Sequence, residues 1–193
     1  MTVARRAPSA RQEELLERAY DYVLAHGLAE LSLRPLAAAI ESSPRVLLFL
    51  FGSKHGLVRA LLARARSDEL ALIDQTRHIG RHDDLATVLR TTWLWLAADA
   101  HRPLLNLWAQ AYARSLVEPG GPWAHFAEQS VADWLAVLAA AQPAARRNTK
   151  LGAAERTLAL SVLRGALLDL LAAGEAERTT AAVDQHLTNL LQS

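Results

Sequence analysis

The side chains with the most specific chemistry lie within residues 32–54, where hydroxyl and basic groups stand at the starts of short apolar runs. Arg45 is the only charged residue of the second apolar run, residues 44–51. Its planar guanidinium can donate two hydrogen bonds to N7 and O6 of guanine. Ser42 and Ser43 offer hydroxyl and backbone N–H groups to a phosphate. These residue types indicate contact with a nucleic acid, with Arg34 as a further candidate for a phosphate contact.

Two short helices are expected to hold these side chains. Ser32 is a suitable N-cap for a helix over residues 32–40. Ser43 can cap a second helix over residues 43–51, with Pro44 at its first position, where proline costs least. Two helices this short and this closely joined match the helix-turn-helix geometry, in which the second helix enters the major groove of DNA.

Length and composition narrow the class of protein. The chain has 193 residues, 51% of them hydrophobic, and it has no cysteine, which excludes disulfides and thiolate metal sites. The first residues have no apolar stretch behind their arginines, so no signal peptide is expected. The most apolar run, residues 158–173, is too short for a membrane span. From the missing signal peptide and membrane span we expect a cytoplasmic protein with no membrane partner. Because no segment alternates with a period of two, we expect no strands and an all-α fold.

Charge is distributed unevenly along the chain. Residues 1–66 contain ten Lys and Arg against six acidic residues, whereas the remainder contains eleven against fourteen. A basic N-terminal third favours a polyanion as partner. The same excess also fits an ordinary solvated surface.

About nine helices in two domains are expected from the apolar spacing and the helix caps. Residues 1–53 form the helix-turn-helix DNA-binding domain, with residues 1–10 as a disordered arm, and residues 54–193 form a larger helical domain. Residues 143–150 are expected to be a basic loop. The expected helices cover residues 9–26, 32–40, 43–51, 53–77, 84–101, 103–118, 122–142, 152–173 and 177–191.

The last two expected helices carry more apolar surface than a chain of this size covers easily. Residues 158–173 are apolar nearly all round, and such a helix must be covered on more than one side. Packing against a second copy in a four-helix bundle would do this, and the alternative is the central helix of a monomeric bundle. Arg164 and Asp169 then pair across the dimer or touch a ligand. The leucines assigned to dimerisation are Leu163, Leu167, Leu170, Leu171, Leu187 and Leu190.

Aromatic residues in the middle of the chain suggest a ligand pocket. Trp108 and Tyr112 lie one helical turn apart, and Asn106 and Gln110 show the same spacing and could supply the few polar groups that an apolar pocket needs. Core packing is the alternative for each aromatic residue, and the two amides could equally face water. The residues assigned to ligand binding are Trp93, Asn106, Trp108, Gln110, Tyr112, Phe126 and Trp134.

A specific combination of residues runs from residue 11 to about residue 60. It comprises Ala19, Gly27, residues 32–37, Ser43, Leu47 and the Phe-Gly-Ser-Lys sequence of residues 51–54, followed by Leu57. The combination resembles the tetracycline-repressor (TetR) family of transcriptional regulators. Two later stretches, residues 130–135 and 163–171, are similar to a C-terminal domain common among such regulators, and they are less diagnostic.

The resemblance implies an all-helical homodimer that binds a palindromic operator in double-stranded DNA. The second part of the chain then forms the pocket and the dimer interface, and a small apolar or aromatic effector releases the repressor by moving the fourth helix. Lys54 matches the lysine with which the family contacts phosphate. The alternative is a ligand-binding or interaction dimer whose operator binding is weakened or lost.

Two departures from the family pattern concern DNA binding. Glu41 stands where the family usually has glycine, because the turn there favours positive φ. Leu48, Phe49 and Leu50 stand where the family favours Tyr and His. Phe49 is assigned here to the DNA-binding set. Three alternatives are open for Phe49 or Leu50: packing on thymine methyl groups, packing against the first helix, or a sign of weakened DNA binding.

No other motif points to chemistry. His78 and His82 have a metal-ligand spacing, but their polar surroundings favour ordinary surface histidines. Phosphate-binding glycine loops, nucleophile elbows and zinc-protease motifs are absent from the sequence. We therefore expect no enzyme, no metal and no cofactor.

Overall fold

The computed structural model describes residues 9–28, 31–79, 84–118 and 120–191, with the side chains of residues 72–79 left out. Over these residues the chain forms ten α-helices and one short 3₁₀ helix, with no strand, which confirms the all-α prediction. Most of the expected arm over residues 1–10, together with His78 and His82 as side chains, lies outside the described part.

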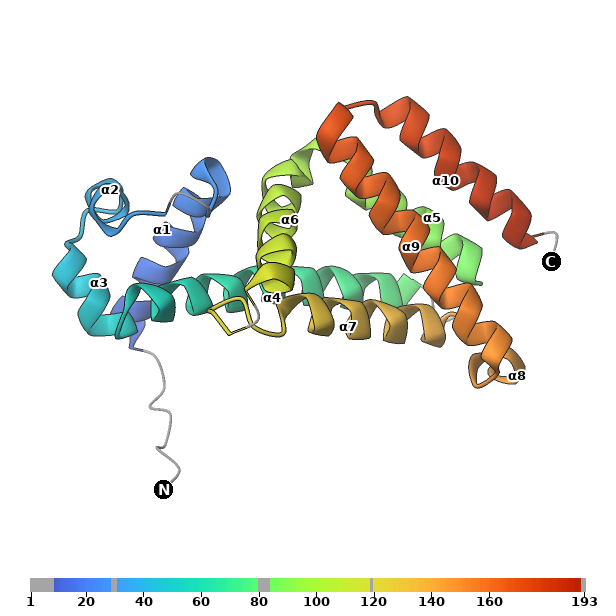
Figure 1. Ribbon diagram of the computed structural model, residues 1–193, viewed down its shortest axis with the longest axis horizontal. Helices are drawn as coiled ribbons and strands as arrows, with labels where there is room; N and C mark the ends of the chain where they lie inside the picture. The colour runs from blue at the N-terminus through green and yellow to red at the C-terminus, as the bar shows by residue number, and fades with distance from the viewer. Residues whose placement is uncertain (1–8, 29–30, 80–83, 119, 192–193) are drawn as a thin grey trace, which may run out of the picture.

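The first three helices form a compact head (Figure 1). They are α1 (Ala10–His26), α2 (Leu33–Ala39) and α3 (Pro44–Phe51). Ser43 caps α3 as expected, since its Oγ accepts a hydrogen bond from the backbone N–H of Val46 at 3.2 Å. Leu36 and Leu47 are almost completely buried between the helices. The head is therefore held by an apolar centre, which leaves the opposite face of α3 outside.

A long helix, α4 (Lys54–Ile79), leads from the head into the second part of the chain (Figure 1). The hydroxyl of Ser53 accepts a hydrogen bond from the backbone N–H of Gly56 at 2.9 Å and so fixes its start. Leu57 and Leu61 of α4 are buried in the same apolar cluster as Leu36 and Leu47. The first turns of α4 thus belong to the head by packing.

The second part consists of α5 (Leu85–Ala97), the 3₁₀ helix η1 (Asp99–His101), α6 (Arg102–Val117), α7 (Phe126–Ala140), α8 (Ala144–Arg147), α9 (Lys150–Ala173) and α10 (Ala176–Leu191). In Figure 1, α7 runs beneath α4, and α9 lies beside α10 with α5 behind. A second apolar cluster fills the space between α5, α7, α9 and α10, around Trp93, Leu138 and Leu170.

Two helix boundaries differ from the expectation by more than two residues, and one expected loop contains a helix. The helix expected from residue 122 begins at Phe126, because Trp123 turns into the core and His125 has φ of 65°, which interrupts helical geometry. Residues 144–147 form α8 where a loop was expected. The helix expected over residues 84–101 ends at Ala97, after which the ring of His101 stacks on Trp95 with centroids 3.8 Å apart.

No single helix among the described residues has the length and apolarity needed to cross a membrane. Only α3 and the first part of α4, taken together, have that length and composition, and the two helices meet at a bend of 71°. The buried apolar side chains of that pair belong to the apolar cluster that includes the core of the head.

Candidate functional site

The outer face of α3 presents a cation and a large apolar side chain. Arg45 and Phe49 are one helical turn apart, opposite the buried Leu47, and both are exposed. Phe49 is 85% exposed, so it does not pack against α1. Leu50 instead packs against the core of the head, and its carbonyl oxygen accepts a hydrogen bond from Nε2 of Gln12 at 3.1 Å.

The other residues assigned to DNA contact lie in α2, just before α3 and at the start of α4. Arg34, Ser43 and Lys54 are exposed, and Ser42 is half-buried. No ion pair within the described residues involves Arg34, Arg45 or Lys54. The hydroxyl oxygen of Ser43 caps α3 by accepting from Val46, and this cap leaves the O–H of Ser43 and the nearby backbone N–H groups as donors to a phosphate.

Glu41 has the positive φ that glycine would adopt most easily, at 54°. Its carboxylate lies 3.4 Å from Arg18, and both side chains are exposed to solvent. Because an exposed ion pair contributes little, about 0–1 kcal/mol, this contact only moderates the negative charge that Glu41 brings to the turn.

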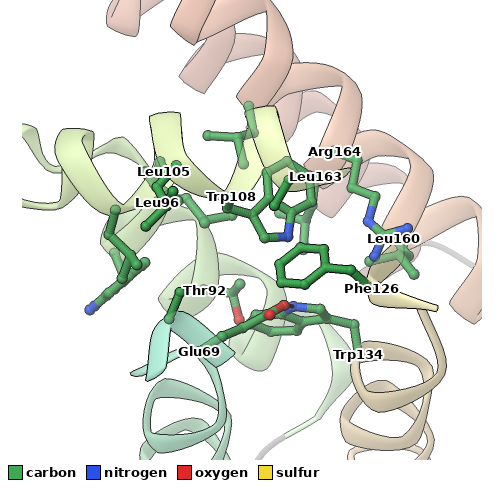
Figure 2. Close-up of a pocket in the computed structure, with 16 residues that line it drawn as sticks. Glu69, Thr92, Leu96, Leu105, Trp108, Phe126, Trp134, Leu160, Leu163 and Arg164 are labelled. Carbon is green, nitrogen blue, oxygen red and sulfur yellow. Dashed lines mark hydrogen bonds between the residues drawn. The ribbon is translucent and has the colours of Figure 1, made fainter. Parts of the chain in front are cut away.

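A small cavity of about 50 Å³ lies in the second part, between α4, α5, α6, α7 and α9 (Figure 2). Its wall is almost entirely apolar and includes Leu96, Leu105, Trp108, Phe126, Trp134 and Leu163. The polar side chains on the wall are Glu69, Thr92 and Arg164. An apolar cavity with a few polar groups is the usual composition of a small-molecule site.

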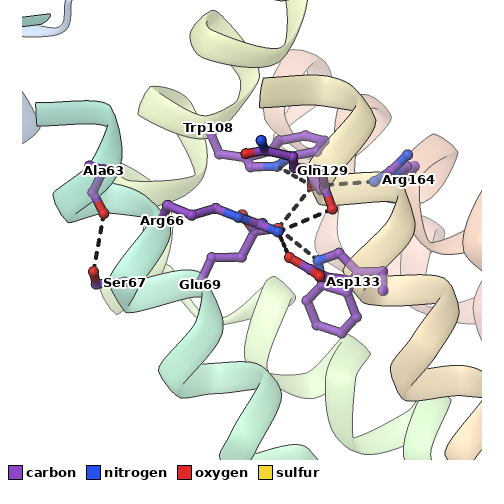
Figure 3. Close-up of polar contacts among 10 residues, drawn as sticks. Ala63, Arg66, Ser67, Glu69, Trp108, Gln129, Asp133 and Arg164 are labelled. Carbon is purple, nitrogen blue, oxygen red and sulfur yellow. Dashed lines mark hydrogen bonds and ion pairs between the residues drawn. The ribbon is translucent and has the colours of Figure 1, made fainter. Parts of the chain in front are cut away.

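Glu69 fastens α4 to α7 through a buried polar network (Figure 3). Its Oε1 accepts hydrogen bonds from the hydroxyl of Ser130 at 2.9 Å and from Nε1 of Trp134 at 2.8 Å. Its Oε2 pairs with Arg66, which also pairs with Asp133 and donates to the carbonyl oxygen of Gln129 at 3.1 Å. The buried carboxylate is therefore fully engaged by α4 and α7.

Arg164 approaches the cavity from α9 (Figure 2). Its guanidinium donates to the hydroxyl of Tyr112 at 3.1 Å and to Oγ of Ser130 at 3.3 Å. It also lies 5.0 Å from the ring centroid of Tyr112 and 5.9 Å from that of Trp108, within cation–π range. Burial lowers the pKa of Arg164 from its ordinary value.

The hydroxyl of Thr92 has no hydrogen-bond partner within the described part of the chain, although the residue is only 1% exposed. Thr92 lies on the cavity wall, on α5. Leaving a buried hydroxyl unpaired costs about 1–3 kcal/mol. Such a group at a cavity wall is an available contact for a bound molecule.

The structure brings only some of the predicted pocket residues to the cavity. The cavity is lined by Trp108, Phe126 and Trp134. Tyr112 does not line it, but its hydroxyl accepts a hydrogen bond from the lining residue Arg164.

The cavity is not lined by Trp93, Asn106 or Gln110, so the assignment of these three residues to the ligand pocket was wrong. Trp93 is buried in the second cluster and donates to the hydroxyl of Thr180 at 3.0 Å. Asn106 is exposed. Oε1 of Gln110 accepts from the backbone N–H of Leu28 at 2.9 Å, which ties α6 to the head.

Glu69 and Thr92 were missed because neither has a local signal in the sequence. Glu69 lies in a helix with many other charged residues, and Thr92 lies between a threonine and a tryptophan. Only the packing of α4 against α5 and α7 reveals their places on the cavity wall.

Four of the six leucines assigned to dimerisation also need correction. Leu163, Leu167, Leu170 and Leu187 are at most 3% exposed within one chain, because they pack between α5, α7, α9 and α10. Leu171 and Leu190 are partly buried against the same cluster. Asp169 pairs with Arg178 of its own chain, with both oxygens 2.7 Å from guanidinium nitrogens, and this contact lowers the pKa of Asp169.

A different face of α9 is exposed and apolar. We call it the α9 stripe and define it as Leu151, Ala154, Leu158, Ser161, Gly165, Leu168 and Ala172, all of which are exposed in the single chain. The spacing of three or four residues places them along one side of the helix. A single chain thus leaves this stripe uncovered.

The described residues contain no group of three or more side chains that could hold a metal ion. The two histidines with metal-ligand spacing lie outside the described side chains, so that spacing stays a sequence observation.

No protein-family model and no curated protein matches this sequence. Solved structures do match. A transcriptional regulator from Rhodococcus sp. Rha1 is 19% identical, with a TM-score of 0.75 over 94% of this chain and 96% of its own. A TetR transcription regulator from Haloarcula marismortui is 14% identical, with a TM-score of 0.68 over 91% and 93%. The multidrug binding protein EbrR, complexed with imidazole, is 23% identical, with a TM-score of 0.68 over 98% and 97%.

At these identities the likeness concerns the fold. The chain has the all-helical fold of TetR-type transcriptional regulators, with a helix-turn-helix head and a larger helical part behind it. This agrees with the resemblance carried by the Phe-Gly-Ser-Lys segment at residues 51–54.

Proposed function

We propose that this protein is a non-catalytic transcriptional regulator of the TetR type, which binds DNA through its head as a homodimer and responds to a small molecule in the cavity. One observation carries the proposal: α4 joins the two sites. Lys54 is its first residue, three positions after the end of α3, and Glu69, fifteen residues later, lies on the cavity wall. At 1.5 Å per residue these positions are about 22 Å apart along one rigid element.

The size of the cavity supports release of DNA on ligand binding. A cavity of about 50 Å³ is smaller than the roughly 150 Å³ that takes up benzene. An aromatic ligand must therefore push the wall apart. Because Glu69 and Arg66 fasten α4 to α7, widening shifts α4 relative to α7 or breaks these contacts. Either change moves the head, and we propose repression relieved by ligand.

The α9 stripe supports the homodimer. Ser161 and Gly165 at its centre are small, and a Cβ built on Gly165 meets nothing within 4 Å, so a second helix can approach closely there. Leu158 and Leu168 flank them with 55% and 51% of their surface exposed. Two stripes packed across a two-fold axis would cover both pairs of leucines.

The test is selection of bound duplexes from a random DNA library with the full-length protein, followed by gel shifts on the enriched sequence. We expect a palindromic site, because a two-fold dimer presents two equal heads. A folded dimer that enriches no sequence and shifts no duplex at low salt would instead support the alternative, a ligand-binding or interaction dimer without operator binding.

Phe49 is expected to read thymine methyl groups. It projects beside Arg45 from the face of α3 opposite Leu47, and an apolar contact with the thymine methyl is an established form of base readout. Replacing the critical thymines of the selected site by uracil should weaken binding about fivefold, the equivalent of roughly 1 kcal/mol. In Phe49→Ala the same replacement should have no effect, and Leu116→Ala, an exposed leucine of α6, should behave as the wild type.

Equal affinity of the wild-type protein for thymine and uracil duplexes at every position would contradict this role of Phe49. It would leave the proposal of DNA binding intact, because Arg45 and the phosphate contacts do not depend on the methyl groups.

A further inference from the structure

Arg164 differs from Arg66, the arginine that pairs with the cavity residue Glu69. Arg66 pairs directly with two carboxylates, those of Glu69 and Asp133. Arg164 donates only to the neutral hydroxyls of Tyr112 and Ser130, and no acidic side chain of the described residues lies within 4.0 Å of its nitrogens. Burial of a cation without a direct counter-ion is unfavourable, and burial accordingly lowers its pKa.

Glu69 is the acidic residue whose charge acts on Arg164, and both of its carboxylate oxygens already have partners. Its Oε1 takes hydrogen bonds from Ser130 and Trp134, and its Oε2 pairs with Arg66. The hydroxyl of Ser130 therefore separates Glu69 from Arg164, donating to the former and accepting from the latter. Glu69 acts on the charge of Arg164 only through space, without a direct contact, and its engaged oxygens leave it poorly placed to receive a ligand cation.

We infer that the molecule bound by the cavity is an aromatic or otherwise apolar carboxylic acid, whose carboxylate pairs with the guanidinium of Arg164. This inference rests on the proposed function, in which the cavity takes a ligand. The planar fork of arginine matches a carboxylate through two parallel hydrogen bonds. The apolar body then lies against Trp108, Phe126 and Trp134.

The charge of the site favours a monoanion. One carboxylate balances the guanidinium of Arg164, which lacks a direct counter-ion, whereas a phosphate dianion would bring a second charge into an otherwise apolar wall. The unpaired hydroxyl of Thr92 lies on the α5 wall, away from Arg164 in Figure 2, and offers a hydrogen bond to a polar atom at the other end of the ligand.

The experiment compares three probes with the same rings and different charge: 2-naphthoate, 2-naphthamide and 2-naphthylmethylamine. Titration calorimetry with the full-length protein should show naphthoate binding about tenfold or more tightly than the amide, as expected for a charge-assisted pair, with the amine weakest. Arg164→Gln should remove this preference, and Arg164→Lys should keep part of it. Arg114→Gln, which breaks an exposed ion pair on α6, should leave all three affinities unchanged.

Equal binding of the acid and the amide, or tightest binding of the amine, by the wild-type protein would overturn the inference while leaving a ligand-binding cavity. The wild-type comparison requires no variant, so a folding defect in Arg164→Gln does not affect it. Failure of all three probes to bind the folded protein would overturn both the inference and the proposed pocket. Binding of naphthoate without release of the selected DNA would overturn only the proposed mode of regulation.

Discussion

Leu168→Glu should convert the protein from a dimer into a monomer and lower its affinity for the palindromic duplex by about 100-fold or more, which corresponds to roughly 2.7 kcal/mol. Leu168 is half exposed in the single chain, and it lies on the α9 stripe, where a second copy would cover it. A carboxylate placed in a dry interface loses its hydration without gaining a partner. Sedimentation of the variant and gel shifts on the selected DNA measure the two effects.

The matched control is Leu116→Glu. Leu116 is also an exposed leucine, at 65%, but it lies near the end of α6 and not on the stripe. This variant should remain dimeric and bind DNA as the wild type. If Leu168→Glu stayed dimeric at micromolar concentration, the interface would have to lie on another face.

The prediction of a dimer also shows which features of α9 the sequence alone could indicate. Because residues 158–173 are apolar nearly all round, the pattern correctly indicated a helix covered on several sides. It could not tell which side faces the same chain. Leu163 and Leu167 face inward, and Leu158 and Leu168 face outward, yet all four are leucines at helical spacing. That choice depends on where α5, α7 and α10 pack, which no local pattern encodes.

The helices of the head could be predicted because local residues determine them, whereas the pocket depends on packing between distant segments. Caps such as Ser43 and the positive φ at Glu41 are local features, determined by neighbouring residues, and the structure has them where the sequence placed them. The cavity wall instead gathers residues from five helices. Gln110 was a reasonable candidate by spacing, but its amide is used to hold the loop at Leu28, 82 residues away in the sequence.

Arg66→Met should lower the free energy of unfolding by about 3–5 kcal/mol, the range for removing one partner of a buried ion pair. The side chains of Arg66 and Glu69 are only 12% and 10% exposed, so solvent cannot replace the lost guanidinium. Methionine fills a similar space, and the loss is therefore mainly that of charge compensation at Glu69. Urea denaturation followed by tryptophan fluorescence measures the change, since Trp134 donates to the same carboxylate.

Arg114→Met is the control for this prediction, because Arg114 pairs with Glu118 one turn along α6 with both side chains about 45% exposed. It should cost about 0–1 kcal/mol. Adding Glu69→Gln to Arg66→Met should recover part of the loss, since a neutral amide oxygen still accepts from Ser130 and Trp134 but needs no cation. If Arg66→Met cost no more than Arg114→Met, the contact between α4 and α7 would not depend on this ion pair. Movement of α4 by a ligand would then have to be transmitted through apolar packing alone.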